Sequence, residues 1–176
     1  MQEHGLKISE LVTLFNLEVL NRGSDYDTAL LTITDVNRPG LQFHSFYDYF
    51  DPRRLQVLGK AEITYLKGLT TEQRRKCFDD LFLYDIPALV ISRGLDCFPE
   101  CLESARVHER TLLRTEETTV EFTSHTIEYL NRVLAPCVTR HGVLLDISGE
   151  GVMITGDSGV GKSESAIELI MRGHRL

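Results

Sequence analysis

Residues 156–163 read GDSGVGKS, which fits the pattern G-x-x-x-x-G-K-[ST]. An apolar run, VMIT, precedes this stretch, and an amphipathic run, ESAIELIM, follows it. A strand before and a helix after are the context that separates a phosphate-binding loop from an incidental glycine-rich turn. The sequence therefore predicts a strand, a loop and a helix in succession, with a loop that binds the phosphates of a nucleotide.

Each type of residue in this loop has a chemical role. Glycines at 156, 159 and 161 allow positive-φ turns that aim consecutive N–H groups at an anion, at the positive end of the following helix. Lys162 is expected to contact the β- and γ-phosphates, and the hydroxyl of Ser163 to ligate Mg²⁺. The predicted nucleotide-binding residues are Gly156, Asp157, Ser158, Gly159, Val160, Gly161, Lys162 and Ser163.

The helix after the loop is expected to present one apolar face to its domain. That face comprises Ala166, Ile167, Ile170 and Met171, which recur at helical spacing. Gly173 follows at the position where a left-handed residue commonly ends a helix. We therefore predict a helix that stops at Gly173 and buries these four side chains.

The loop predicts a ligand but not a reaction. ATPases, GTPases and kinases share it, and they differ in acids and bases that other segments supply. Upstream, His141 begins the strand of RHGVLLD, one hairpin before the loop strand. From the residues alone, a hydrogen-bonded histidine at a strand end is favoured over an active-site histidine.

The first part of the chain alternates short apolar runs with helical patterns, which predicts an open α/β domain over residues 1–133. The run PALVIS reads as a strand buried on both faces. Pro136 then ends a long helical pattern, and a hairpin pattern with the turn SGEG replaces it. We therefore expect a second domain to occupy residues 134–176.

Several local elements of the first domain can be predicted. Capping boxes at Thr70 with Gln73 and at Thr118 with Glu121 indicate helix starts. Ser9 is a candidate cap for a short helix. Residues 54–69 read as a β-rich stretch with Gly59 at a bulge or bend. The helix after Thr118 is expected to bury an apolar stripe, Val120, Ile127, Leu130 and Leu134.

The composition excludes some functions. The formal net charge is −7, and the basic residues are scattered, so nucleic-acid binding is disfavoured. There is no run of 18 apolar residues and no leader pattern, so we expect no membrane association and a cytoplasmic location. The four cysteines include only one close pair, Cys97 and Cys101, which favours reduced thiols over a zinc site.

Residues 141–176, HGVLLDISGEGVMITGDSGVGKSESAIELIMRGHRL, resemble the start of the catalytic domain of the bacterial HPr kinase/phosphorylase family. The preceding chain is similar to the N-terminal domain of that family. The similar segments are ELVTLFNLEVL, RPGLQFHSFYDYF, RLQVLGKAEITYL and PALVISRGLDCFPECLESA. The resemblance covers essentially the whole sequence.

The resemblance implies an enzyme that uses ATP or pyrophosphate, with Mg²⁺, to phosphorylate a serine of HPr, the phosphocarrier of the sugar phosphotransferase system. It also implies the reverse reaction, in which phosphate attacks phosphoserine-HPr and pyrophosphate is released. By position, it makes His141 and Lys162 active-site residues and Ser163 a magnesium ligand. It further implies a homohexamer that regulates carbon catabolite repression.

The same resemblance implies an N-terminal fold akin to the substrate domains of Mur ligases and a catalytic fold akin to phosphoenolpyruvate carboxykinase. Family members continue past RGHRL into an aspartate that serves as the proton-transfer residue. The chain is therefore expected to be truncated and inactive as a kinase alone, because a positioned base is typically worth about 10²–10⁴-fold in rate. Two alternatives remain: another P-loop ATPase or small-molecule kinase, and a non-catalytic oligomerisation module.

Overall fold

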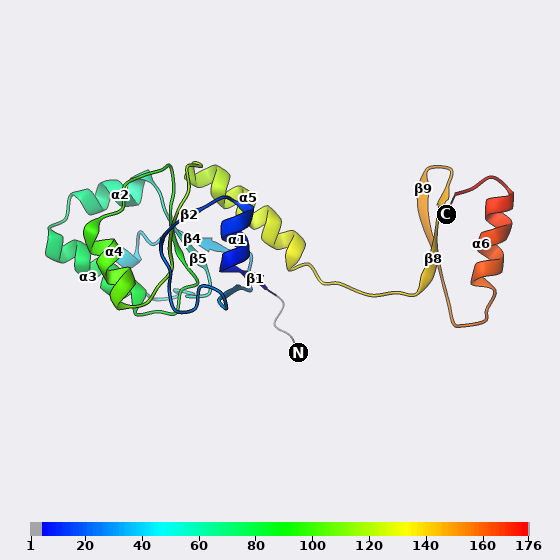
Figure 1. The fold of residues 1–176 in the computed structure, drawn as a ribbon, viewed down its shortest axis with the longest axis horizontal. Helices are drawn as coiled ribbons and strands as arrows, with labels where there is room; N and C mark the ends of the chain where they lie inside the picture. The colour runs from blue at the N-terminus through cyan, green and yellow to red at the C-terminus, as the bar shows by residue number, and fades with distance from the viewer. Residues whose placement is uncertain (1–4, 176) are drawn as a thin grey trace. The chain divides into compact units, whose positions relative to one another are not determined.

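The computed structural model describes residues 5–175. The chain divides into two compact units, the first ending at Ala135 and the second beginning at Pro136. Each unit has its own sheet, and Figure 1 shows the helices that belong to each. None of the helices in the described part of the chain combines the length and the apolar character that crossing a bilayer requires.

The first unit contains a five-stranded sheet in the order β2-β7-β6-β5-β4. The neighbours β7, β6, β5 and β4 are parallel, and β2 joins the edge antiparallel to β7. A separate antiparallel pair is formed by β1 and β3. The strands are β1 (Leu6–Lys7), β2 (Glu18–Asn21), β3 (Leu30–Leu31), β4 (Val36–Asn37), β5 (Leu55–Leu58), β6 (Leu89–Ile91) and β7 (Leu112–Arg114). The predicted α/β class is confirmed, with a sheet that is mostly parallel.

Helices cover both faces of this sheet, which is why its central strand, β6, is apolar throughout. The side chains of α2, α3 and α4 pack on one face, and those of α1 and α5 pack on the other. The predicted strand in PALVIS is confirmed as β6, whose three residues are all buried. The helices are α1 (Ile8–Leu14), η1 (Gln42–His44), α2 (Lys60–Lys67), α3 (Thr71–Phe82), α4 (Pro99–Val107) and α5 (Thr119–Val133).

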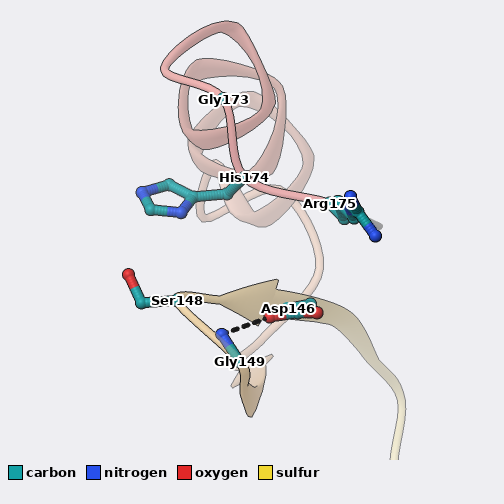
Figure 2. A pocket seen from close by; sticks show the side chains of 6 residues that line it. All are labelled: Asp146, Ser148, Gly149, Gly173, His174 and Arg175. Atoms are coloured by element: carbon teal, nitrogen blue, oxygen red, sulfur yellow. Dashed lines mark hydrogen bonds between the residues drawn. The ribbon is translucent and has the colours of Figure 1, made fainter.

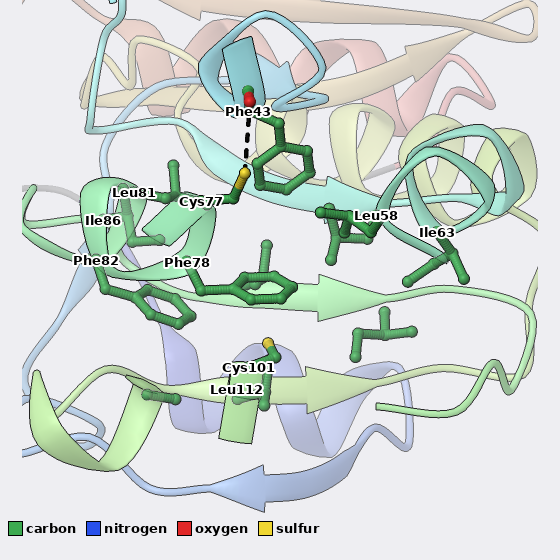
Figure 3. Close-up of a cluster of buried hydrophobic side chains, with 14 residues drawn as sticks. Phe43, Leu58, Ile63, Cys77, Phe78, Leu81, Phe82, Ile86, Cys101 and Leu112 are labelled. Carbon is green, nitrogen blue, oxygen red and sulfur yellow. Dashed lines mark hydrogen bonds between the residues drawn. The ribbon is translucent and has the colours of Figure 1, made fainter. Parts of the chain in front are cut away.

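The larger of the two cores is built around the aromatic side chains of α3. Figure 3 shows Phe78 and Phe82 among aliphatic side chains of the sheet, with Phe43 of η1 above them. The Phe43 and Phe78 rings meet edge to face, with centroids 5.8 Å apart. The thiol of Cys77 donates a hydrogen bond to the Phe43 carbonyl at 3.4 Å. This contact joins the irregular segment around η1 to the core.

Both predicted capping boxes are present. The amide of Gln73 donates to Thr70 Oγ1 at 3.3 Å, and the Thr70 amide donates to Gln73 Oε1 at 3.0 Å. At α5, the Glu121 amide donates to Thr118 Oγ1 at 3.3 Å, and the Thr118 amide donates to Glu121 Oε2 at 3.1 Å. Each pair of bonds satisfies donors that a helix start leaves unpaired, so the two predicted starts are confirmed.

The prediction for residues 54–69 is wrong in its second half. Only β5 is a strand, and Gly59 is the N-cap of α2 and not a bulge. The Gly59 amide donates to Glu62 Oε2 at 2.9 Å, which begins the helix. Ile63 and Leu66 then lie one turn apart and are both buried. Helical spacing of core contacts thus outweighs the β preference of the individual side chains.

Two further local predictions are corrected. Lys7, and not Ser9, is the N-cap of α1, because Ile8 is already helical and buried and its amide donates to the Ala29 carbonyl at 3.1 Å. In α5, Val120 is 72% exposed. The buried stripe of that helix is Thr119, Phe122, Thr126 and Leu130, because these positions face the sheet once the helix has docked.

The second unit consists of a β-hairpin and one helix. Its elements are β8 (Gly142–Ile147), β9 (Glu150–Thr155) and α6 (Lys162–Met171). The two strands pair antiparallel over six residue pairs, and the turn residues Ser148 and Gly149 both have positive φ. Such a two-residue turn matches the twist of the strands it joins, so the predicted hairpin is confirmed.

Contact between α6 and the hairpin is narrower than predicted. Leu145 of β8 and Ala166 of α6 are buried, whereas Ile167 is 57% and Met171 is 79% exposed. A two-stranded hairpin offers only a narrow apolar surface, and the side of α6 that carries Ala166 occupies it. Gly173 ends the helix as predicted, with φ of 97° and its amide donating to the Ile170 carbonyl at 2.9 Å.

Candidate functional site

The predicted phosphate loop lies between the end of β9 and the start of α6. Gly159 has φ of 83°, and Gly161, the N-cap of α6, has φ of 90°. Both values lie in the left-handed region, so a side chain at either position would strain the backbone and glycine is favoured there. Around Gly159, the space that a Cβ would occupy holds no other atom within 4 Å. The loop is therefore open at the point where a ligand would approach its backbone.

Lys162 lies across this loop. Its Nζ donates to the Gly156 carbonyl oxygen at 2.7 Å and to the Asp157 carbonyl oxygen at 2.6 Å. The ammonium group thus lies against the loop backbone, and no acidic side chain among residues 5–175 pairs with it. Phosphate oxygens carry more charge than backbone carbonyls, so a phosphate chain in the loop would compete well for this ammonium.

The first turn of α6 supplies the remaining donors. Its leading amides have no intrahelical partners, and the helix dipole gives this end partial positive charge. Ser163 is exposed in this turn, with its hydroxyl beside the loop in sequence. The amide and hydroxyl of Ser165 both donate to the Gly161 carbonyl at 2.9 Å, which holds that carbonyl within the helix.

The donor set fits a phosphate chain with its magnesium ion. Across residues 5–175, no cluster of three or more histidine, cysteine or acidic side chains is arranged to hold a metal ion. Mg²⁺ in nucleotide sites keeps several waters and takes its other ligands from the phosphates and from one or two carboxylates, so a hydroxyl of the loop would supply one ligand among several. Ser163, which is exposed in the first turn of α6, is the residue that would provide this hydroxyl.

His141 reaches the same end of the hairpin through strand register. Gly142 pairs with Thr155, the last residue of β9, and the pairing is antiparallel. The next positions outward are therefore His141 on one strand and Gly156, the first residue of the loop, on the other. His141 is exposed there. The hairpin thus brings the backbone of His141 beside the phosphate loop, although 14 intervening residue positions separate them in sequence.

A pocket of about 340 Å³ lies at the opposite end of the hairpin (Figure 2). The Gly149 amide donates to Asp146 Oδ1 at 2.7 Å across the turn. Asp146 and Arg175 exchange two backbone hydrogen bonds, at 2.8 and 3.1 Å. These contacts attach the segment after α6 to the edge of β8. The pocket contains none of the predicted site residues, and we assign it a structural role.

Two features of the site were missed by sequence reasoning. One is the contact of Lys162 with the loop carbonyls, for which the sequence carries no signal. The other is Gly142, where a Cβ would lie 2.6 Å from the Ile154 carbonyl oxygen. A glycine at the first position of a mostly apolar strand was a usable signal, because glycine in a strand often marks the close approach of another backbone.

Two protein-family models match the chain. The model described as HPr Serine kinase N terminus matches residues 6–130, and the one described as HPr Serine kinase C-terminal domain matches residues 132–176. Together they account for nearly all of the sequence.

Curated relatives agree with these matches. A protein of Alkaliphilus metalliredigens named HPr kinase/phosphorylase is 46% identical over 171 residues, which cover 97% of this chain and 55% of the relative. A protein of the same name from Clostridium perfringens is 45% identical over 172 residues, which cover 98% of this chain and 55% of the relative. The chain thus spans about half the length of the curated relatives it matches.

One solved structure is similar in fold alone. It comprises the CBS and DRTGG domains of the regulatory region of a Clostridium perfringens pyrophosphatase, complexed with diadenosine tetraphosphate. The TM-score is 0.53 at 10% sequence identity, and the match covers 95% of this chain and 60% of the other. At that identity the similarity extends to the arrangement of strands and helices and no further.

Proposed function

The chain belongs to the HPr serine kinase family, and we propose that it carries the phosphate-binding part of an enzyme that phosphorylates a serine of HPr. The phosphoryl donor is ATP or pyrophosphate, with Mg²⁺. In reverse, an oxygen of inorganic phosphate attacks the phosphorus of phosphoserine-HPr, the bond to the serine oxygen breaks, the serine hydroxyl is restored by a proton from the attacking phosphate, and pyrophosphate is released. The observation that carries this proposal is the loop of residues 156–163, in which Lys162 lies across an open turn at the start of a helix.

Each residue of the site has a distinct role in the proposal. The loop backbone of residues 156–163 binds the phosphates through its N–H groups, and Lys162 adds a point charge. Ser163 contributes one oxygen to Mg²⁺. His141 acts as an active-site residue beside the transferred group, a role supported by its register position next to Gly156.

This arrangement suits a reaction that runs in both directions. Phosphoryl transfer asks little covalent chemistry of the protein and depends on positioning and charge neutralisation. ATP, when bound, supplies the phosphoryl group that is transferred. A loop that binds the β-phosphate of ATP presents the same N–H groups and ammonium to pyrophosphate or phosphate. The relative concentrations of these ligands then decide the direction.

The wider properties of the family are part of the proposal. We propose that residues 1–133 form a domain akin to the substrate domains of Mur ligases, and that residues 134–176 begin a catalytic domain akin to phosphoenolpyruvate carboxykinase. The whole protein would assemble as a homohexamer in the cytoplasm and regulate carbon catabolite repression. HPr is its protein partner, and neither nucleic acid nor membrane is a partner, as the net charge of −7 suggests for nucleic acid.

Ligand binding is the first test. Isothermal titration of the 176-residue chain with Mg-pyrophosphate and with Mg-ATP should show binding at one site. Lys162→Ala should weaken it at least tenfold, because the ammonium contact is lost. Lys76→Ala is the control, since Lys76 pairs with Asp80 on the exposed side of α3, in the first unit. Equal affinity for wild type and Lys162→Ala would contradict the proposed role of the loop.

Catalysis is tested in a chimera. Residues 1–176 are joined to the part of the Alkaliphilus metalliredigens relative that the match does not cover, and the product is incubated with HPr and Mg-ATP. Mass spectrometry should detect phosphoserine on HPr, and the Lys162→Ala chimera should produce none. ATP consumption without HPr phosphorylation would instead support another P-loop ATPase or small-molecule kinase. An intact oligomer that neither consumes ATP nor phosphorylates HPr would support the alternative that the chain is a non-catalytic oligomerisation module.

A further inference from the structure

Gly142, the first residue of β8, lies close to the backbone of β9. A Cβ built on it would be 2.6 Å from the carbonyl oxygen of Ile154 and 2.9 Å from Cε of Met153. Real Cβ atoms essentially never come within 3.0 Å of another heavy atom. Atoms of β9 therefore occupy the space that a Cβ at position 142 would need.

Of these two contacts, only the one with the Ile154 carbonyl oxygen involves the backbone of β9. Met153 is 45% exposed and ends in a flexible chain, so its methyl group can move aside. The Ile154 carbonyl belongs to the backbone of β9, whose residue Ile154 pairs with Val143. It can move only if the strands separate at that end of the ladder.

That end of the ladder is where β9 enters the phosphate loop. Gly142 pairs with Thr155, so the gap between the strands at Gly142 also sets the separation of His141 and Gly156. A side chain at position 142 would open the last pair and carry His141 away from the loop. At the other end of the hairpin, Gly151 has no heavy atom within 4 Å of the position that its Cβ would take.

We propose that Gly142 is a positioning residue that holds His141 beside the phosphate loop. Its missing side chain allows β8 and β9 to pair up to the start of the loop, so the backbone of His141 lies beside Gly156. The inference rests on the proposed function, because it assigns a purpose to the proximity of His141. It adds a residue that contacts neither the phosphates nor the transferred group.

The test compares Gly142→Ala with Gly151→Ala in the 176-residue chain. Nuclear Overhauser effects between the backbone protons of residues 141 and 156 report the distance between these two residues without any ligand. They should be present in wild type and Gly151→Ala and lost in Gly142→Ala, while contacts between Leu145 and Val152 persist in all three. Their absence from the wild type would overturn the inference even if Gly142→Ala failed to fold.

A second measurement tests whether the separation of β8 and β9 at Gly142 affects the position of His141 relative to a ligand in the loop. On saturation with Mg-pyrophosphate, the imidazole resonances of His141 should shift in wild type and Gly151→Ala. In Gly142→Ala, the affinity for pyrophosphate should stay within about threefold of the wild-type affinity, because the loop is intact. The change in the His141 imidazole resonances on binding should fall below about half of the wild-type change. An undiminished shift in Gly142→Ala would refute the positioning role. Absence of pyrophosphate binding by the wild type would instead count against the proposed function, and the ligand-free contacts would still decide the inference.

The double variant Gly142→Ala/Met153→Ala shows whether the Ile154 carbonyl or the Met153 side chain obstructs a Cβ at position 142. If the Ile154 carbonyl forces the strands apart, the double variant should still lack the contacts between residues 141 and 156. If the contacts return, the obstruction is the Met153 side chain, and the close approach of the two backbones is not what places His141.

Discussion

Arg74 and Arg75 are neighbours on α3, and each pairs with a glutamate of α4, but their surroundings differ. Arg74 pairs with Glu100, with side-chain exposures of 17% and 7%. Arg75 pairs with Glu103, and both side chains are about half exposed. Replacing each arginine by alanine and comparing the two losses of stability therefore measures how burial changes the contribution of an ion pair.

Arg74 joins three helices. Its Nη2 donates to Glu100 Oε1 at 2.8 Å, and its Nη1 donates to the carbonyl oxygens of Leu69 at 2.8 Å and Leu66 at 3.3 Å. Its guanidinium also lies 5.0 Å from the centroid of the Phe98 ring. Arg74→Ala would leave the Glu100 carboxylate buried without its cation, which typically costs about 3–5 kcal/mol. We expect a loss of about 3 kcal/mol, the low end of that range, because Arg74 is partly exposed.

Tyrosine fluorescence during urea unfolding is the assay, because all six tyrosines lie in the first unit and the chain has no tryptophan. Arg74→Ala should lower the free energy of unfolding by about 3 kcal/mol, whereas Arg75→Ala should change it by no more than about 1 kcal/mol. Equal effects of the two substitutions would refute the reasoning, because burial would then add nothing.

The stability that the Arg74–Glu100 pair contributes should fall at acidic pH. Hydrogen bonding to Arg74 lowers the pKa of Glu100 below its usual value of 4.5. The stability that this pair contributes is therefore fully present above pH 4.5 and is lost as the pH falls through the lower pKa of the folded state. The stability difference between the wild type and Glu100→Gln should shrink below pH 4.5.

Three other substitutions or treatments test further contacts. Thr118→Ala removes a helix cap and should destabilise the first unit by about 1 kcal/mol, whereas Val120→Ala, at an exposed position two residues on, should leave its urea midpoint unchanged. Phe78→Ala empties the centre of the larger core and should cost about 3–5 kcal/mol in the same assay; a cost below about 1 kcal/mol would show that the site collapses. A hydrogen bond from Cys101 lowers the pKa of the Cys97 thiol, and burial raises that of Cys101, so iodoacetamide at pH 7.5 should alkylate Cys97 before Cys101, as peptide mass mapping would show.

The local chemistry of the sequence was enough to predict much of this protein. The phosphate loop needs glycine at 159 and 161 because of the φ values it adopts, and that need is visible in eight consecutive residues. The caps at Thr70 and Thr118 are equally local, since each closes within three residues. The buried strand β6 could be read from its run of apolar side chains.

Contacts between distant segments could not be predicted in this way. Whether Gly59 bends a strand or caps a helix depended on which surface Ile63 and Leu66 would meet. The exposure of Ile167 and Met171 depended on how wide a surface the hairpin offers to α6. The approach of Ile154 to Gly142 depended on register across the hairpin. A sequence determines the conformations that its own neighbours favour, but burial and close approach are properties of pairs of segments, and only the tertiary structure decides which segments meet.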